Sequence, residues 1–321
     1  MTMPTTLARH PVARLRERAR LLALRGSFAV QDLVAPDRAS SRALDLWCTV
    51  PNGAGRRKDF RPFPGEVATT RTSTGHEVVT ESWGTGPVVY LVHGWGGWRG
   101  QLGAFVEPLV ATGHRVVGFD APGHGESAPG ALGTGKGHIM ELLAAFESVA
   151  ARHGAAAGVV AHSLGCTIAS IVVHDRLDAA RLVLVGAPAD FGDRTYEFAA
   201  AVGFTERTRG RLQTTMEQEC GRPLAAFDLA PLAASGRLPE TLLIHDQFDK
   251  EAPYRVSEEL AAGWPTATLL TTLGLGHQRI LTDPEVVAAA VRHITSATPA
   301  DRHDRPASRG GRQEDPPRPR T

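Results

Sequence analysis

Short apolar runs without charges, separated by longer helical segments, dominate the sequence from Pro87 onward. The runs occupy residues 88–92, 116–119, 158–161, 182–185 and 241–244. They are too short to be helices, and continuous Val, Leu and Ile is typical of strands buried on both faces of a parallel sheet. Parallel strands need crossover connections, which the helical segments between the runs can supply. The pattern therefore predicts an α/β fold with a mostly parallel central sheet flanked by helices.

One interval is too long for this rhythm. Residues 186–240 separate two of the apolar runs, which is far more chain than a single crossover helix needs. Residues 194–202 and 205–220 both have helical spacing. We therefore expect an α/β domain over residues 66–297 with a small helical cap at about 190–238. The Pro/Arg-rich residues 298–321 cannot bury a core and are predicted to be a disordered tail.

The first 65 residues form an N-terminal extension that we expect to be partly helical. Its first 25 residues are basic, and their apolar residues recur at roughly helical spacing. Such a helix could contact an anionic membrane surface. A helix packed on the domain is the better interpretation, because the apolar face is weak and lacks aromatic residues. Residues 51–65 are an irregular connection, and 66–71 with 77–82 suggest a β-hairpin.

Charge and cysteine content narrow the range of expected partners and cellular compartments. The formal net charge of +1 provides no global field to attract nucleic acid, so no nucleic-acid partner is expected. The three cysteines have no zinc spacing, and their odd number argues against a disulfide framework. No signal-like or membrane-spanning stretch is evident. A cytoplasmic protein without a metal is the simplest expectation.

The segment from Val159 to Ala169 carries the strongest chemical signal. A buried strand runs directly into a helix through a turn with Ser163 at its apex, flanked two positions away by Ala161 and Gly165. This is the pattern of a nucleophile elbow, although its first small residue is Ala rather than Gly. By itself, the pattern is equally compatible with a buried structural serine.

Two glycine-rich loops follow other predicted strands. His-Gly-Trp-Gly-Gly (93–97) can direct backbone N–H groups at a carbonyl oxygen, and Asp-Ala-Pro-Gly-His-Gly-Glu-Ser (120–127) forms a tight turn. The N–H groups of Trp95 and Leu164 are the expected oxyanion hole. A near match to a phosphate-binding loop at 130–137 has Gly137 in place of the required hydroxyl residue, which argues against nucleotide hydrolysis.

These three motifs, in this order, resemble the α/β-hydrolase superfamily over roughly residues 75–296. The resemblance implies a triad in the chain order nucleophile, acid, base. Ser163 matches the nucleophile, and His277 matches the base because it lies on a glycine-rich loop before the last predicted helix, 284–294. Asp249 matches the acid. The resemblance also implies that His93, His124 and Asp120 are structural.

The acid has two rivals. Asp246 lies close to Asp249 but is expected to cap its own turn, and Asp190 follows an earlier strand where some relatives carry the acid. His162 and Trp98 are candidate substrate contacts, Trp98 because it flanks the predicted pocket mouth together with Trp95.

The implied activity is that of a serine hydrolase acting on a carboxylic ester, with a thioester or amide as further options, through an acyl-enzyme and without a cofactor. The partner would be a small ester-like molecule. Acyl transfer or C–C hydrolysis by the same triad and non-catalytic ligand binding remain alternatives. Apolar cap residues would serve a hydrophobic substrate group or simply pack, namely Phe191, Tyr196, Phe198, Phe204 and Met216.

Overall fold

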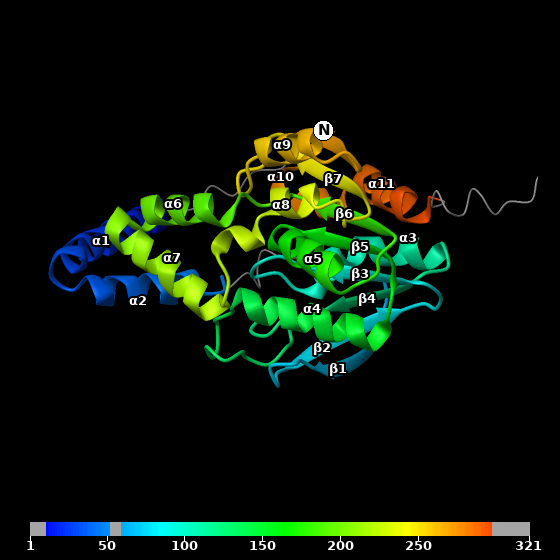
Figure 1. The fold of residues 1–321 in the computed structure, drawn as a ribbon, viewed down its shortest axis with the longest axis horizontal. Helices are drawn as coiled ribbons and strands as arrows, with labels where there is room; N and C mark the ends of the chain where they lie inside the picture. The colour runs from blue at the N-terminus through cyan, green and yellow to red at the C-terminus, as the bar shows by residue number, and fades with distance from the viewer. Residues whose placement is uncertain (1–10, 52–58, 297–321) are drawn as a thin grey trace, which may run out of the picture.

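An eight-stranded sheet forms the centre of the computed structural model, which describes residues 11–51 and 59–296 (Figure 1). The strand order is β1-β2-β4-β3-β5-β6-β7-β8. All neighbours from β4 to β8 are parallel, whereas β1–β2 and β2–β4 are antiparallel. The strands are β1 (Glu66–Arg71), β2 (Glu77–Trp83), β3 (Val88–Val92), β4 (Arg115–Phe119), β5 (Ala156–His162), β6 (Arg181–Val185), β7 (Glu240–Asp246) and β8 (Ala267–Thr272).

The predicted strands all fall within observed ones, but β8 was not predicted. Its sequence, ATLLTT, is rich in threonine and only partly buried, because β8 forms the edge of the sheet. An edge strand is covered less completely than a central one, so its sequence has no continuous apolar run. The mostly parallel sheet is confirmed.

Helices cover both faces of the sheet, as the alternation of side chains along β3 requires. Tyr90 and Val92 pack in the core cluster that contains α4 (Ile139–His153) and α5 (Leu164–Asp175). Val89 and Leu91 pack on the opposite face. The helices of that face are η1 (Arg99–Phe105), α3 (Val106–Ala111), α10 (Gly276–Arg279), η3 (Ile280–Thr282) and α11 (Pro284–Thr295). On the first face, η2 (Leu224–Phe227), α8 (Leu229–Ala234) and α9 (Arg255–Gly263) complete the layer.

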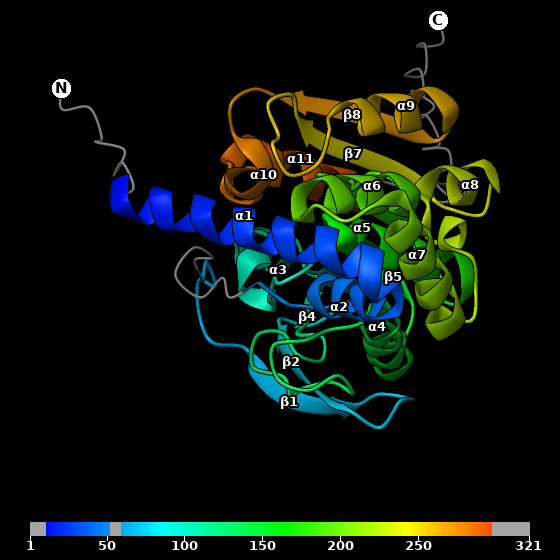
Figure 2. The same ribbon diagram turned by 90° about the vertical axis from the view of Figure 1, so that its left-hand side faces the viewer.

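Four helices gather at one end of the molecule, on the left of Figure 1, and we call them the four-helix cap. Two of them, α6 (Phe191–Val202) and α7 (Glu206–Cys220), lie in the long interval between β6 and β7. The other two, α1 (Pro11–Val34) and α2 (Pro36–Trp47), come from the N-terminal extension (Figure 2). The insertion and the extension therefore form one structure.

Residues of α1 that follow the predicted 25-residue segment attach this helix to the start of α7 and to the residues just before it. Phe28 is fully buried, and its ring centroid lies 5.4 Å from that of Phe204. The Asp32 carboxylate accepts hydrogen bonds from the Thr205 backbone N–H (2.8 Å) and the Thr208 hydroxyl, and so caps the start of α7. Packing on the domain is thus the observed arrangement for this half of α1, whereas residues 1–10 lie outside the described residues, as does the predicted tail.

The loop that resembled a phosphate-binding loop has a structural task. Lys136 Nζ donates to Asp45 Oδ1 at 2.6 Å and to Thr49 Oγ1 at 2.9 Å. The Gly137 N–H donates to Cys48 O (2.9 Å). These bonds hold the end of α2 against the sheet domain.

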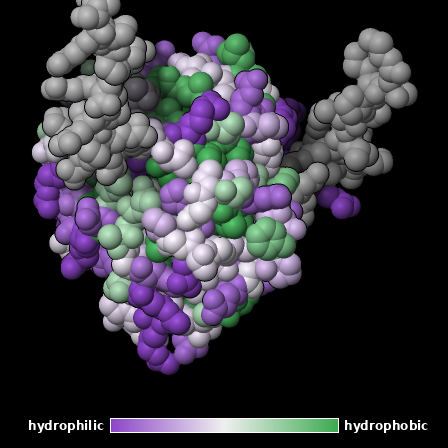
Figure 3. All heavy atoms as spheres, turned by 90° about the vertical axis from the view of Figure 1, so that its right-hand side faces the viewer, coloured by the Kyte–Doolittle hydropathy of each residue, from purple (hydrophilic) through white to green (hydrophobic). Residues whose placement is uncertain are grey.

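Among the described helices, none is both long and apolar enough to cross a membrane. The face opposite the cap has hydrophilic residues interspersed with hydrophobic ones (Figure 3).

Candidate active site

The backbone of Ser163 has the conformation that a nucleophile elbow requires. Its φ of 54° makes it the one non-glycine residue with positive φ in the described part of the chain. Such a conformation costs of order 1–3 kcal/mol and persists only where surrounding contacts enforce it. Here the Ser163 N–H donates to Val185 O at 2.9 Å, and α5 starts at the next residue. The turn therefore exposes Oγ at the carboxyl edge of the sheet.

Close backbone approach explains the small residues beside the elbow. A Cβ added at Gly165 would lie 2.5 Å from Val92 O, and one at Gly94 would lie 2.8 Å from Ser163 Cβ. Ala161, which departs from the usual glycine, is fully buried in β5 and regular in its strand pairing.

His277 is joined to Asp249. His277 Nδ1 and Asp249 Oδ2 are 2.6 Å apart, and both side chains are nearly inaccessible. The other carboxylate oxygen accepts the backbone N–H groups of Glu251 (2.7 Å) and Ala252 (3.0 Å). With Nδ1–H directed at the carboxylate, Nε2 of His277 is left as the proton acceptor.

Two histidines influence the charge of Asp249. Burial by itself would raise the pKa of the Asp249 carboxyl, but hydrogen bonds from His245 and His277 outweigh it and hold the pKa well below its usual range. His245 Nε2 lies 3.5 Å from Asp249 Oδ2, and its Nδ1 lies 2.7 Å from Ser257 Oγ. The sequence analysis did not single out His245, since its apolar strand context resembles that of any core residue.

Asp246 has a different set of partners. It accepts the Phe248 N–H at 3.0 Å, the Thr272 hydroxyl at 2.9 Å and the Leu275 N–H at 2.8 Å. These bonds close its own turn and connect it to the loop that carries His277. In the described structure, the carboxylate that hydrogen-bonds His277 is Asp249, and neither Asp246 nor Asp190 does so.

Ser163 and His277 face one small cavity of about 20 Å³, together with Gly94 and Trp95. Between these two described residues there is no hydrogen bond. Nucleophile–base hydrogen bonds are often long in a free enzyme and tighten when substrate is bound.

His162 supports the loop of the base. Its Nε2 lies 2.9 Å from the carbonyl oxygen of His277, and the two ring centroids are 4.6 Å apart. His162 also lines the small cavity. His93 connects two loops in a similar way, with Nδ1 at 2.8 Å from Gly94 O and Nε2 accepting the Ala121 N–H at 3.0 Å.

The two residues expected to form the oxyanion hole lie beside Ser163. Leu164 is the first residue of α5, and its N–H donates no hydrogen bond within the described part of the chain. The Trp95 indole donates to Thr49 O at 3.3 Å. Both residues line the same large cavity as Ser163. The positive end of α5 favours negative charge at this place.

Trp98 does not have the predicted position. It lines neither of the two cavities that contain Ser163. Its ring lies 5.0 Å from the guanidinium carbon of Arg61 and 5.8 Å from that of Arg99. The indole thus makes cation–π contacts with two arginines.

A buried ionic network, which sequence reasoning missed, lies behind the two glycine-rich loops. The Arg99 side chain is 1% exposed and contacts the carboxylates of Glu81 (2.9 Å), Asp120 and Glu126. The Arg99 backbone N–H also donates to Asp120 Oδ1 at 2.7 Å. Asp120 therefore holds both its own turn and the start of η1.

We expect Arg99→Ala to lower the free energy of unfolding by about 3–5 kcal/mol, because Asp120 would remain buried without its cation and Glu81 would keep only Arg61. Arg71→Ala is the matched control, since its pair with Glu77 is exposed (2.9 Å) and should contribute nothing measurable. Urea unfolding of both variants measures this. Equal stability of the two variants would contradict the role assigned to Arg99.

Gly186 leaves space for the His–Asp pair. It has φ 61°, and an added Cβ would lie 3.2 Å from His277 Nδ1 and 3.7 Å from Asp249 Oδ2. We expect Gly186→Ala to lower kcat/KM about a hundredfold by displacing His277, since small misplacements of catalytic groups have effects of this size. Gly210→Ala in α7, where a Cβ meets no atom, should leave kcat/KM unchanged. Turnover by both purified variants measures this, and equal rates would contradict it.

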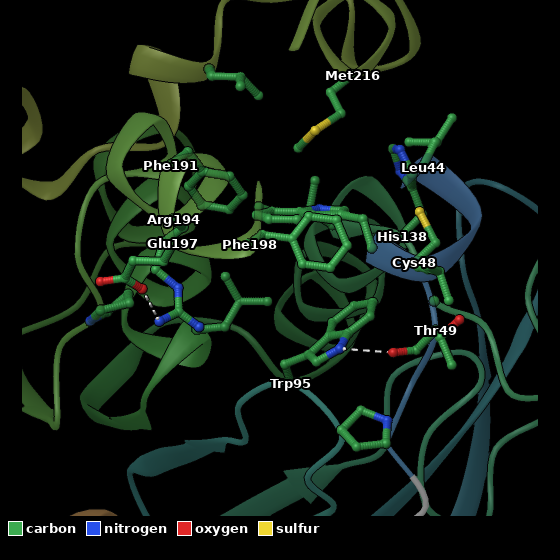
Figure 4. A pocket seen from close by; sticks show the side chains of 18 of the residues that line it. Leu44, Cys48, Thr49, Trp95, His138, Phe191, Arg194, Glu197, Phe198 and Met216 are labelled. Atoms are coloured by element: carbon green, nitrogen blue, oxygen red, sulfur yellow. Dashed lines mark hydrogen bonds and ion pairs between the residues drawn. The ribbon is translucent and has the colours of Figure 1, made fainter. Parts of the chain in front are cut away.

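The larger cavity extends from Ser163 into the four-helix cap and has a volume of about 650 Å³ (Figure 4). In Figure 4, Phe191, Phe198 and Met216 face it from α6 and α7, and Leu44 faces it from α2. This volume lies within the usual range for small-molecule sites. In the described residues, no group of three or more His, Cys, Asp or Glu side chains is arranged to hold a metal ion.

The sheet, the Ser163 elbow and the His277–Asp249 pair together define an α/β protein built around a strand–turn–helix nucleophile site. The chain belongs to the alpha/beta hydrolase family, whose model matches residues 89–290.

The proteins to which this chain is similar are of several kinds. A dihydrolipoyllysine-residue acetyltransferase component of the acetoin cleaving system from Cupriavidus necator is 32% identical over 123 residues, covering 38% of this chain and 31% of that protein. A non-heme haloperoxidase from Rhodococcus erythropolis is 36% identical over 123 residues, covering 36% and 42%. The matches thus span less than half of either relative. The solved structure of an esterase from Exiguobacterium antarcticum has a TM-score of 0.55 and 17% identity, covering 72% of this chain and all of that one.

Proposed function

We propose that this protein is a serine hydrolase that cleaves a carboxylic ester, or by the same chemistry a thioester or amide, through an acyl-enzyme. The observation that carries the proposal is the position of the strained Ser163 at the same cavity as His277, whose ring is hydrogen-bonded to Asp249 at 2.6 Å. Membership of the alpha/beta hydrolase family supports hydrolytic chemistry.

In the first half-reaction, His277 Nε2 takes the proton of Ser163 Oγ as the oxygen attacks the carbonyl carbon. The negative charge that develops on the carbonyl oxygen is stabilised by the N–H groups of Leu164 and Trp95. Asp249 keeps His277 in the required tautomer and stabilises its protonated form. His277 then gives the proton to the leaving group, and the acyl group stays on Ser163.

In the second half-reaction, His277 removes a proton from water as the water oxygen attacks the carbonyl carbon of the acyl-enzyme. His277 then returns this proton to Ser163 Oγ as the bond to the acyl group breaks, and the acid is released. Acyl transfer differs only in the acceptor. Measuring free acid against a new ester in the presence of a small alcohol distinguishes the two, because a transferase would form mainly the ester.

Reaction with a fluorophosphonate probe tests the proposal. We expect Ser163 to be the labelled residue by peptide mapping, with no labelling in Ser163→Ala and strongly reduced labelling in His277→Ala. If correctly folded protein reacted no faster than Ser163→Ala, the protein would be a ligand-binding member of the family rather than an enzyme.

A further inference from the structure

Two cavities meet at Ser163, and they differ in which catalytic groups they contain. The small one contains Ser163 and His277, the large one contains Ser163 and Leu164 but not His277, and Trp95 lines both. A general acid must be within hydrogen-bond reach of the leaving-group atom that it protonates. The leaving group and the hydrolytic water therefore belong to the small cavity, and the acyl half of the substrate belongs to the large one.

We propose that the N-terminal helices α1 and α2, together with α6 and α7, form an acyl-binding site for a large, uncharged, apolar acid whose leaving group is polar. This inference rests on the proposed function and specifies its substrate class. The N-terminal helices lie outside the residues matched by the family model.

The wall that the cap contributes to the large cavity is mostly apolar, and its charged side chains are Arg194 and Glu197 of α6. Leu24 and Trp47 line it from the N-terminal helices, and Phe191, Phe198 and Met216 line it from α6 and α7. The Trp47 ring lies 5.3 Å from that of Phe198, so the two halves of the cap contact each other directly across this wall. A volume of about 650 Å³ is far larger than an acetyl group needs.

The charges at the large cavity are already paired. Arg194 Nη1 donates to Glu197 Oε2 at 2.9 Å and to the Glu251 carbonyl oxygen at 3.2 Å. A carboxylate at the far end of an acyl chain would lose its hydration shell without finding a free cation to pair with, and such desolvation is costly. The site thus favours an uncharged chain.

The small cavity is polar. A chain of hydrogen bonds runs along it, from Gln101 Nε2 to Gln278 Oε1 (3.1 Å) and from Gln278 Nε2 to Glu251 Oε2 (3.5 Å). Its volume of about 20 Å³ is enough for one water molecule. Glu251 is exposed, so a longer polar leaving group can extend past it into solvent.

The test is an acyl-chain series of p-nitrophenyl esters from acetate to decanoate. Each CH2 that enters an apolar site adds about 0.8 kcal/mol, or roughly fourfold, until the chain is fully accommodated. We expect kcat/KM of the natural protein to rise about a hundredfold or more from acetate to decanoate. A second series compares decanoate esters of ethylene glycol and of hexanol, and the glycol ester should react faster.

Leu44→Trp narrows the large cavity from α2 and should reduce the decanoate-to-acetate ratio of kcat/KM at least tenfold. Leu22→Trp is the matched control, because Leu22 lies on α1, is 70% exposed and does not line the cavity, and its ratio should equal that of the natural protein. Should Leu44→Trp fail to fold, Ala201→Trp narrows the same cavity from the exposed side of α6.

The outcomes separate this inference from the function. Suppose that the probe labels Ser163 but kcat/KM is highest for the acetate ester, or that neither Leu44→Trp nor Ala201→Trp changes the decanoate-to-acetate ratio. Either result would overturn the acyl site and leave the proposed hydrolase function intact. A faster reaction of the hexanol ester would overturn the assignment of the polar cavity. Absence of both labelling and hydrolysis would overturn the proposed function itself.

Discussion

Replacement of Ser163 by alanine is expected to lower kcat for an ester about a million-fold, the size of loss seen when a catalytic serine is removed from a triad. No other side chain at the elbow can form the acyl-enzyme, and only the oxyanion hole and substrate binding would remain. The residual rate should therefore show no burst of released alcohol. Stopped-flow and steady-state assays of the purified variant measure both quantities.

Ser170→Ala is the matched control for this experiment. Ser170 is a fully buried serine on the same helix, α5, and its hydroxyl has no hydrogen-bond partner in the described structure. We expect its kcat to stay within about twofold of the natural protein, since an unpartnered hydroxyl outside the cavities has no part in the reaction. A loss in Ser163→Ala no greater than in Ser170→Ala would exclude an acyl-enzyme on Ser163.

Replacement of Asp249 by asparagine is expected to lower kcat about ten-thousand-fold. An amide in this position can donate its N–H to His277 Nδ1, and the ring would then carry its proton on Nε2, where it cannot accept one from Ser163. The geometry would be retained while the base is lost. Steady-state kinetics, together with circular dichroism to verify the fold, measure this.

Asp246→Asn distinguishes the two carboxylates. Asp246 accepts hydrogen bonds from Thr272 Oγ1 and from the N–H groups of Phe248 and Leu275, so its replacement should lower stability by about 1–3 kcal/mol and affect kcat much less. A ten-thousand-fold loss in Asp246→Asn with a nearly normal Asp249→Asn would make Asp246 the acid.

The hydrogen bonds that the histidines make to Asp249 also make the stability of the protein depend on pH. Because hydrogen bonds from His245 and His277 hold the pKa of folded Asp249 below the unfolded value of about 4, ionised Asp249 contributes stability above that pH. This contribution is lost as the pH falls through the lower, folded-state pKa. In urea unfolding, the stability difference between the natural protein and Asp249→Asn should thus not change through Asp249 between pH 7 and about 4, and should shrink as the pH falls below about 4.

The central strands and the elbow could be predicted because their signals are local. A strand that is buried on both faces must be a continuous apolar run, and a turn as tight as that at Ser163 excludes large neighbours. His277 could be predicted from chain order and its glycine-rich loop once the family resemblance was available. By contrast, the edge strand β8 and the burial of Arg99 could not be predicted. Whether a strand or a side chain is covered depends on elements that are distant in sequence, so the local sequence does not reveal it.

The choice between Asp249 and Asp246 illustrates this limit. Both are carboxylates on the same turn, three residues apart, and both suit a position near the base. Only the hydrogen bonds separate them, since Asp249 contacts the His277 ring while Asp246 accepts from the surrounding loops. Trp98, which was expected at the pocket mouth, lines neither cavity that contains Ser163 and instead contacts Arg61, a residue that no local pattern connects with it.

By itself, the sequence determined the α/β fold, the helical interval after β6, the position of Ser163 on a turn after a predicted strand and that of His277 on a loop before the last predicted helix. Periodicity, chain length and turn chemistry act between residues close together in the chain, so they can be recognised there. The tertiary structure alone decided which carboxylate contacts His277 and that α1 and α2 wall the large cavity. Those outcomes arise from packing between segments that are apart in the chain, by 28 residues for Asp249 and His277 and by more than a hundred for Phe28 and Phe204.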